Sequence, residues 1–367
     1  MSSDTARSGP VARRGVARPA EDRWPGLAVP PPTRARGRLA RLVFARAVGR
    51  VGVRATFPDG RSIGSIGADV PVMRLVDADA FFRRLGVDGK IGFGESYMTG
   101  DWDTDDLPGV LTAFAGGVRT LVPPRLQFLR RWYDARQPDD EDNTIEGARA
   151  NIHRHYDLSN ELFALFLDET MTYSGAWFEP DDSLSEAQVR KIDGILDMAG
   201  VGSDTHLLEI GTGWGALAIR AAAHRGARVT SLTISAEQKA LAEARIEAAG
   251  VADRVQVLLR DYREAQGQYD AVVSVEMIEA VGERYWSTYF GALDRLVKPG
   301  GRVALQSITM PHDRLMLSRH SYTWMHKYIF PGGLLPSITA IEKNLAEHTG
   351  LRLVERRDLG TDYAETL

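Results

Sequence analysis

The C-terminal part of the chain alternates short apolar runs with longer amphipathic stretches. The apolar runs predict strands over 206–210, 228–232, 255–259, 271–275, 302–308 and 351–357. Apolar residues at helical spacing predict helices over 216–224, 236–249 and 284–297. Strands that alternate with helices of this length favour a parallel, doubly wound sheet. Residues 151–367 are therefore predicted to form one α/β domain.

The N-terminal part has a different pattern. Residues 1–36 hold six of the seventeen prolines with scattered Arg, and such a segment is predicted to be disordered. Residues 38–50 predict a short basic helix, although its apolar and Arg positions do not separate cleanly. Alternation over 51–57, a turn at 58–60 and a helix near 79–85 indicate a small α+β domain over 37–118. Residues 119–150, with the acidic run 138–142, are interpreted as a solvated linker.

Charge and composition narrow the function. Residues 1–50 carry a net charge of +8 within a chain of net charge −4, which indicates an anionic partner, nucleic acid or a membrane surface, or else a solvated tail. The absence of cysteine excludes disulfides, thiolate metal sites and a Cys nucleophile, and no metal site is predicted. No apolar run reaches the ~20 residues that span a bilayer, and no secretory signal is evident. The expected location is cytoplasmic, with peripheral membrane contact left open.

A glycine-rich loop follows the first predicted strand of the α/β domain. The sequence LLEIGTGWGALAI places Gly211, Gly213 and Gly215 before a helix, where a nucleotide-like ligand binds in doubly wound folds. A dinucleotide site requires an acid about 20 residues later, at the end of the second strand. Here that strand ends in Leu232–Ser235, and the next acid is Glu237. A dinucleotide, another nucleotide-like cofactor and a loop without ligand all remain open at this point.

Several longer segments resemble one family of enzymes. They are HYDLSNELFALFLDETMTYSGAWF (155–178), the glycine loop, LTISAEQ (232–238), RDY (260–262), SVEMIEAVGERYWSTYF (274–290), KYIFPGGLLPS (327–337) and DYAETL (362–367). In this order and spacing they resemble the cyclopropane-fatty-acyl-phospholipid synthase family of S-adenosylmethionine-dependent methyltransferases. The EMIEAVG form resembles the methyl-branching, tuberculostearate type of member. The resemblance implies a class I, Rossmann-like methyltransferase domain after a small lipid-associated α+β domain.

The resemblance also implies a cofactor site for S-adenosylmethionine. The matching residues are Tyr173, Ser174, Glu209, Gly211, Gly213, Gly215, Thr233, Gln238, Asp261 and Tyr262. Thr233 and Gln238 would serve the ribose and amino-acid ends of the ligand. Glu209 would support the loop or the amino group. Asp261 would accept from the adenine amine or cap a helix, and the two roles are equally compatible with the sequence.

Family members that form cyclopropane rings resemble one another in holding a bicarbonate ion as the base. The positions that match its cradle are Gly175, Glu279, Gln306, Ile308 and Tyr363. Gly175 stands where the family has Cys and Gln306 where it has His, so a bicarbonate site would be retained but altered. Alternatively, Glu279 and Tyr363 would act through water. On either interpretation Glu279 and Tyr363 are the predicted catalytic residues.

The family acts on the cis double bond of unsaturated acyl chains of phospholipids, through a carbocation. Proton loss closes a cyclopropane ring or, after a hydride shift, leaves a methylene branch that a reductase partner converts to a methyl branch. The EMIEAVG motif favours branching. The basic head would then meet an anionic membrane surface and not nucleic acid, and a homodimer is left open. The family usually continues past DYAETL, so an inactive lipid-binding homologue is the main alternative, and a NAD-dependent enzyme is disfavoured.

Overall fold

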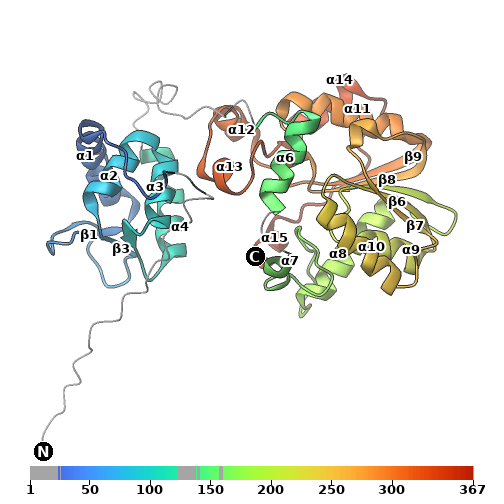
Figure 1. Ribbon diagram of the computed structural model, residues 1–367, viewed down its shortest axis with the longest axis horizontal. Coiled ribbons are helices and arrows are strands. Elements are labelled where there is room, and N and C mark those ends of the chain that lie inside the picture. Colours follow the sequence, from blue (N-terminus) through green and yellow to red (C-terminus); the bar gives the residue numbers. More distant parts are fainter. Residues whose placement is uncertain (1–23, 25, 122–137, 139–140, 157–159, 367) are drawn as a thin grey trace, which may run out of the picture. The chain divides into compact units, whose positions relative to one another are not determined.

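The computed structural model describes residues 24, 26–121, 138, 141–156 and 160–366. The chain divides into two compact units (Figure 1). The first comprises Met1–Arg136 with Tyr322–Trp324, and the second comprises Gln137–Ser321 with Met325–Leu367. The division at 136–137 falls inside the segment predicted as a linker. No described helix is both long and apolar enough to cross a membrane.

The first unit packs helices on a small mixed sheet. Its strands are β1 (Arg54–Thr56), β2 (Ser62–Gly64), β3 (Val72–Leu75) and β4 (Trp102–Asp103), in the order β2-β1-β3-β4. Its helices are α1 (Arg34–Val51), α2 (Ala78–Asp88), α3 (Lys90–Met98) and α4 (Leu107–Leu121). Aromatic residues fill the core, and Phe81 and Trp102 are almost fully buried.

Two N-terminal boundaries differ from the sequence prediction. Helix α1 begins at Arg34, inside the segment predicted to be disordered, whereas 1–23 and 25 lie outside the described residues. The strand predicted from residue 51 starts only at Arg54, because α1 continues to Val51 and Gly52 ends it with a left-handed φ of 76°. The helix and the turn predicted over 79–85 and 58–60 are confirmed.

The predicted linker is wrong at its C-terminal end. Helix α6 (Ile145–Tyr156) begins within it. The described end of the acidic run is not solvated either, because Glu141 is buried and Asp142 accepts hydrogen bonds from Arg284 Nη1 at 2.8 Å and the Tyr285 hydroxyl at 3.2 Å. Proximity to this Arg–Tyr pair, which lies far along the chain, turns an apparent loop into part of the second unit.

The second unit contains the predicted parallel, doubly wound sheet. Its strands are β5 (His206–Ile210), β6 (Arg228–Thr233), β7 (Val255–Leu259), β8 (Tyr269–Val275) and β9 (Val297–Gln306), all parallel, in the order β7-β6-β5-β8-β9. Successive residues of a strand face opposite sides. Accordingly Leu207 packs in one core cluster and Leu208 in the other.

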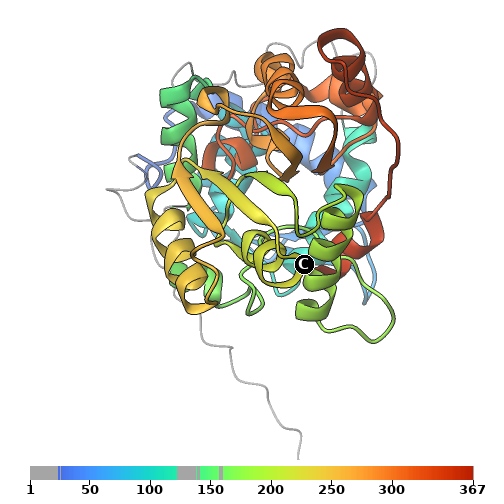
Figure 2. The ribbon, with the colours of Figure 1, turned by 90° about the vertical axis from the view of Figure 1, so that its right-hand side faces the viewer.

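Helices cover both faces of this sheet (Figures 1 and 2). The cluster that contains Leu207 includes residues of α8 (Leu184–Met198), α9 (Ala216–Arg225) and α10 (Ala236–Ala248). The cluster that contains Leu208 includes α11 (Trp286–Leu296) and α14 (Ile338–His348). Shorter elements complete the unit: α7 (Asn160–Ala164), η3 (Tyr262–Glu264), η4 (Ile278–Ala280), η5 (Glu283–Tyr285), α12 (His312–Ser318) and α15 (Gly360–Thr366). Helix α13 (Trp324–Tyr328) belongs to this unit from Met325 onward.

The strand predicted over 351–357 is absent. This segment is irregular and mostly exposed, with 52% of Leu353 and 83% of Val354 accessible. Its alternating residues have the right pattern, but a strand also needs a neighbour to take its backbone hydrogen bonds. Among the described residues β9 pairs only with β8.

Candidate active site

A cavity lies beyond the carboxyl ends of β5, β6 and β8. Parallel strands end at the same edge of the sheet, so the residues that follow them are brought together. The cavity is lined by Glu209–Gly213, Leu232–Ile234 and Val275–Met277, from three segments up to 68 residues apart in sequence. This is the place where the glycine loop was predicted to bind its ligand.

The three glycines of the loop have different roles. All have positive φ: 98° at Gly211, 52° at Gly213 and 88° at Gly215. A Cβ at Gly213 would meet no atom within 4 Å, so the backbone there is open to a ligand. Gly215 caps α9 and lies against Ala242 of α10, and it is not among the described residues that line the cavity. The structure thus places two of the three predicted glycines at the cavity.

Two buried groups of opposite charge lie at the cavity. Glu209 on β5 accepts a hydrogen bond from Ser231 Oγ, and burial raises its pKa to about 8. Lys191 on α8 donates to Ser174 Oγ at 2.6 Å, and burial lowers its pKa to about 8. Each group favours the charged form of the other, but burial dominates in both. Lys191 was not predicted as a site residue, because one Lys on an amphipathic helix is normally a solvated residue.

The predicted polar residues after β6 and β7 also line the cavity. Thr233 Oγ1 donates to Gln238 Oε1 at 2.9 Å, which holds the amide side chain against the strand end. Asp261 accepts from the Arg263 backbone N–H at 2.9 Å and pairs with the guanidinium, so it caps η3. Of the two roles predicted for Asp261, this geometry favours the cap. Burial raises the pKa of Tyr262, so its hydroxyl keeps its proton.

The outer wall of the cavity comes from a segment that sequence reasoning assigned elsewhere. Asn143 and Asn151 line it, together with Phe330 and Pro331. Asn143 Nδ2 donates to the Gly332 carbonyl at 2.8 Å, and Asn151 Nδ2 donates to Asn143 Oδ1 at 2.9 Å. Part of the predicted linker is therefore part of the candidate site. The side chain of Tyr156, in the quoted HYDLSN segment, lies outside the described residues.

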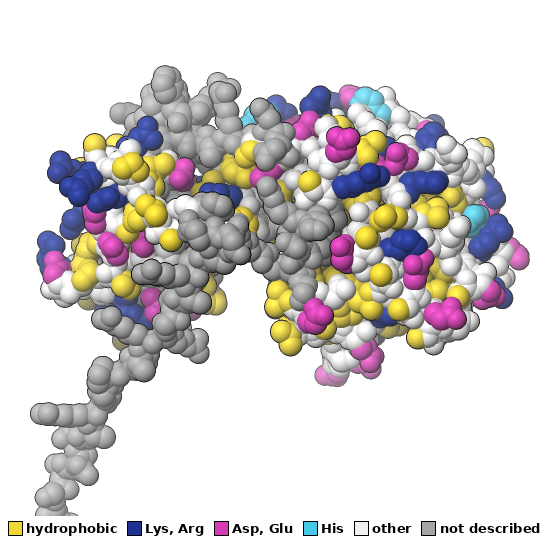
Figure 3. Space-filling view, viewed as in Figure 1, with side chains coloured by type: hydrophobic (Ala, Val, Ile, Leu, Met, Phe, Trp, Pro, Cys, Tyr) yellow, Lys and Arg dark blue, Asp and Glu magenta, His cyan; other side chains and the backbone are white. Residues whose placement is uncertain are grey.

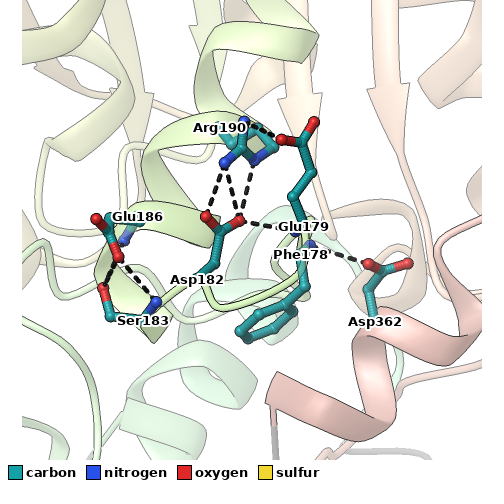
Figure 4. A network of polar contacts seen from close by, with 7 residues as sticks. All are labelled: Phe178, Glu179, Asp182, Ser183, Glu186, Arg190 and Asp362. Atoms are coloured by element: carbon teal, nitrogen blue, oxygen red, sulfur yellow. Dashed lines mark hydrogen bonds and ion pairs between the residues drawn. The ribbon is translucent and has the colours of Figure 1, made fainter.

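The loop that carries Tyr173, Ser174 and Gly175 is fixed from two sides. Gln188 Nε2 donates to the Ser174 carbonyl at 2.8 Å. Farther on, Asp362 of α15 accepts from the Phe178 backbone N–H at 2.9 Å (Figure 4). In the same view Asp182 receives the Arg190 guanidinium, which also pairs with Glu179. These contacts hold an irregular segment in one conformation beside the cavity.

The predicted bicarbonate cradle contains a protein carboxylate. Glu276 Oε1 accepts from the Gly175 backbone N–H at 2.9 Å and from Gln306 Nε2 at 3.0 Å. Tyr363 lies against Gly175, where a Cβ would come within 2.6 Å of Tyr363 Cδ2. Glu276 belongs to the EMIEAVG motif, but no role was predicted for it from the sequence.

The other two members of the predicted cradle form a separate pair. Ile308 donates its backbone N–H to Glu279 Oε1, while the buried Glu279 Oε2 has no hydrogen-bond partner among the described residues. Burial raises the pKa of Glu279 to about 7. Glu279 is only 2% exposed and is not among the described residues that line the cavity, whereas Glu276 lines it.

Comparison with known proteins assigns the chain to a family. The model of the mycolic acid cyclopropane synthetase family matches residues 144–367. The chain belongs to this family. Tuberculostearic acid methyltransferase UfaA1 of Mycobacterium tuberculosis is 51% identical over 357 residues, which cover 94% of this chain and 83% of the relative. Cyclopropane-fatty-acyl-phospholipid synthase of Escherichia coli is 36% identical over 83% of this chain and 76% of the relative.

A solved member of the family has the same fold. The crystal structure of mycolic acid cyclopropane synthase CmaA1 in complex with SAH and CTAB aligns with a TM-score of 0.55 and 31% identity. The alignment covers 63% of this chain and 81% of that chain. Membership of the cyclopropane synthetase family confirms the resemblance drawn from the sequence and sets aside the NAD-dependent interpretation of the glycine loop.

Proposed function

We propose that the protein transfers a methyl group from S-adenosylmethionine to the cis double bond of an unsaturated acyl chain of a phospholipid. The observation that carries this proposal is the cavity at the ends of β5 and β6, where the open backbone of Gly213 lies beside Glu209 and Gln238. Family membership makes the chain an S-adenosylmethionine-dependent methyltransferase. The names of its relatives from M. tuberculosis and E. coli support a fatty acyl substrate.

The residues that line the cavity fit a cationic, nucleotide-like ligand. Thr233 and Gln238 would hold its hydroxyl and amino-acid groups, and a bound cation would favour the charged form of the buried Glu209. When bound, S-adenosylmethionine supplies a sulfonium methyl group that is electrophilic enough to react with an alkene. The protein must orient the two reactants and keep water away.

Aromatic side chains suit the cationic character of the reaction. Tyr173 lines the cavity and packs edge-on against Phe163, with ring centroids 5.2 Å apart. Burial, together with the nearby Glu276 charge, raises the pKa of Tyr173, so its ring stays neutral. A neutral aromatic face attracts a carbocation without reacting with it. Tyr173 would therefore shield the cation that methyl addition leaves on the acyl chain.

A methylene branch is the product that we propose. The EMIEAVG motif and the 51% identity to a tuberculostearic acid methyltransferase both support branching over ring closure. A partner that donates hydride would be needed to reduce the methylene to a methyl branch. The reaction of this protein would end at the alkene.

Labelled S-adenosylmethionine and dioleoyl phosphatidylglycerol vesicles provide the test. After incubation the acyl chains are released and analysed by mass spectrometry, and the expected result is the gain of one labelled CH2 unit. Distearoyl vesicles, which lack a double bond, are the control and should gain nothing. No gain on dioleoyl chains under any condition would contradict the proposal and favour an inactive lipid-binding homologue. NMR of the product distinguishes a methylene branch from a cyclopropane ring.

We further propose that α1 docks on an anionic membrane surface. Its six Arg residues are all exposed, its sequence contains no acid, and dark blue side chains gather over it in Figure 3. Leu39, Leu42 and Val43 are also exposed, each by at least half, and their spacing places them on one side of the helix. The buried residues Phe44 and Val48 face the core of the first unit. The exposed Arg and apolar side chains are interspersed on this helix, so the contact with an anionic surface would rest mainly on charge.

Sedimentation with vesicles tests this contact. Each Arg near an anionic surface contributes about 1 kcal/mol, so the double variant Arg41→Glu/Arg46→Glu, which loses two of them, should bind phosphatidylglycerol vesicles at least ~10-fold more weakly. Neutral phosphatidylcholine vesicles should bind both proteins equally weakly. Arg352→Glu, an exposed Arg of the second unit, is the matched control. Equal binding of the double variant and the wild type would exclude α1 as the docking helix.

A further inference from the structure

We infer that Glu276 is the base of the reaction, so that a carboxylate of the chain itself takes the place of the bicarbonate ion that one of the two interpretations of the sequence put there. This inference rests on the proposed function and names the group that accepts the proton. It differs from the sequence prediction, which placed that role on Glu279 and Tyr363 or on a bound anion.

The position of the Glu276 carboxylate is the first argument. Its Oε1 accepts from the Gly175 backbone N–H at 2.9 Å and from Gln306 Nε2 at 3.0 Å, and these two groups belong to the predicted bicarbonate cradle. Gln306 Nε2 also donates to the Gly175 carbonyl at 2.9 Å, which ties the two donors together. A second anion in this place would compete for the same hydrogens and would meet a like charge. The donors of the cradle therefore bind a carboxylate that is part of the chain.

The second argument is the atom that remains available. No described residue donates a hydrogen bond to Glu276 Oε2, and Oε2 is not among the fully buried atoms that lack a partner. Glu276 lines the cavity, and its side chain is half-buried. Oε2 is thus a carboxylate oxygen that accepts no hydrogen bond from a described residue, on a side chain of a residue that lines the cavity. Glu279, by contrast, is 2% exposed and is not among the described residues that line the cavity.

The backbone at Glu276 gives a third argument. This residue directly follows β8 and has φ 49°, in the left-handed region that favours glycine. Its N–H donates to the Gln306 carbonyl at 2.9 Å, which holds the strained conformation. A glycine would fit this backbone with less strain. A carboxylate in a place where glycine is the easier residue points to a functional role for the side chain.

The chemical step requires only a base. The π electrons of the double bond form a bond to the methyl carbon, and the C–S bond breaks with its electrons left on sulfur. The second alkene carbon becomes a cation, and a hydride shift moves the charge to the carbon that carries the new methyl. Glu276 Oε2 then takes a proton from that methyl, and the C–H electrons form the methylene double bond. No oxidant or reductant is consumed.

The test compares wild type with two variants at Glu276, in buffer freed of carbon dioxide. Glu276→Gln keeps an acceptor for both donors but removes the base, so turnover should fall at least ~100-fold. Affinity for S-adenosylmethionine, measured by calorimetry, should change less than ~3-fold, because Thr233, Gln238 and the glycine loop are untouched. Glu276→Gly suits the local backbone and should fold. The loss of its side chain opens space for a small anion. Added bicarbonate or formate should raise the turnover of the Glu276→Gly variant at least ~10-fold.

Wild-type turnover should be unchanged within ~2-fold when bicarbonate is added, because the base is already in place. Glu243→Gln, on the exposed side of α10, is the matched control and should behave as wild type. Wild-type turnover that depends on bicarbonate, or full turnover by Glu276→Gln, would overturn the inference and leave the proposed function intact. Loss of turnover in Glu276→Gly without rescue by either anion would also overturn it. A wild type that transfers no label would overturn the proposed function, and this inference with it.

Discussion

The close approach of Tyr363 to Gly175 allows one substitution to be worked through quantitatively. In Gly175→Ala the new Cβ would lie 2.6 Å from Tyr363 Cδ2 and 3.2 Å from Cε2. Ordinary contact begins near 3.4 Å, so the ring would have to retreat by several tenths of an ångström. It cannot do so freely, because Asp362 and Thr366 on the same helix accept hydrogen bonds from the Phe178 and Ala176 backbone N–H groups.

The expected cost follows from two opposing effects. Extra volume in a packed site destabilises by about 1–3 kcal/mol. Replacing Gly by Ala also removes conformational freedom from the unfolded chain, which returns about 0.4–1 kcal/mol. The free energy of unfolding of Gly175→Ala should therefore fall by about 1–2 kcal/mol. Gly291→Ala in α11 is the control, because its Cβ meets no atom within 4 Å and should stabilise the helix by about 0.5–1 kcal/mol.

Urea unfolding, followed by circular dichroism, measures these differences as shifts in midpoint at constant slope. The decisive comparison is made in a Tyr363→Ala background, where the ring is gone. There Gly175→Ala should cost nothing or should stabilise slightly, which gives a coupling energy of at least about 1 kcal/mol. An equal loss of stability with and without the Tyr363 ring would show that the clash is not with this side chain.

Three further predictions concern the site. Asp362→Ala should lower the free energy of unfolding by about 1 kcal/mol and speed hydrogen exchange at the Phe178 amide, whereas Asp358→Ala should leave that amide unchanged. Burial raises the pKa of Glu209 from 4.5 to about 8, so the folded state favours its protonated form. The free energy of unfolding should therefore decrease as the pH rises between those two values. Glu209→Gln should flatten that decrease in thermal unfolding, and an unchanged slope would count against a buried Glu209. Gln238→Ala should weaken S-adenosylmethionine binding about 5-fold by calorimetry, and an unchanged affinity would remove the amide from the site.

The pattern of apolar residues and glycines was sufficient to predict the features that depend on residues close together in the sequence. The glycine loop was predicted from the residues between a strand and a helix, and the cavity forms there. The parallel, doubly wound sheet that contains β5 was predicted from the alternation of strands and helices. Glu209, Thr233 and Gln238 were selected because they match residues of the family, and the structure places them at or after the ends of β5 and β6, where they line the cavity.

Features that depend on distant partners could not be predicted in this way. Lys191 looks like an exposed helix residue until the packing of α8 buries it beside Glu209. Asn143 lies next to an acidic run, and it becomes part of the cavity through distant contacts such as its hydrogen bond to the Gly332 carbonyl, 189 residues away. The segment 351–357 shows the opposite error, because its alternation is strand-like but it pairs with no strand in the described part of the chain. In each case the deciding contact is tertiary.

The way in which the loop 175–178 is held has a consequence for the order of folding. Three of its backbone N–H groups are satisfied by side chains from Glu276, Thr366 and Asp362, which lie 101 to 190 residues later. Contacts of such long sequence separation form late, because a large loop must close before they stabilise anything. During synthesis the sheet and the glycine loop can therefore assemble before this segment is ordered. The site would become competent only once 360–366 has emerged from the ribosome and docked.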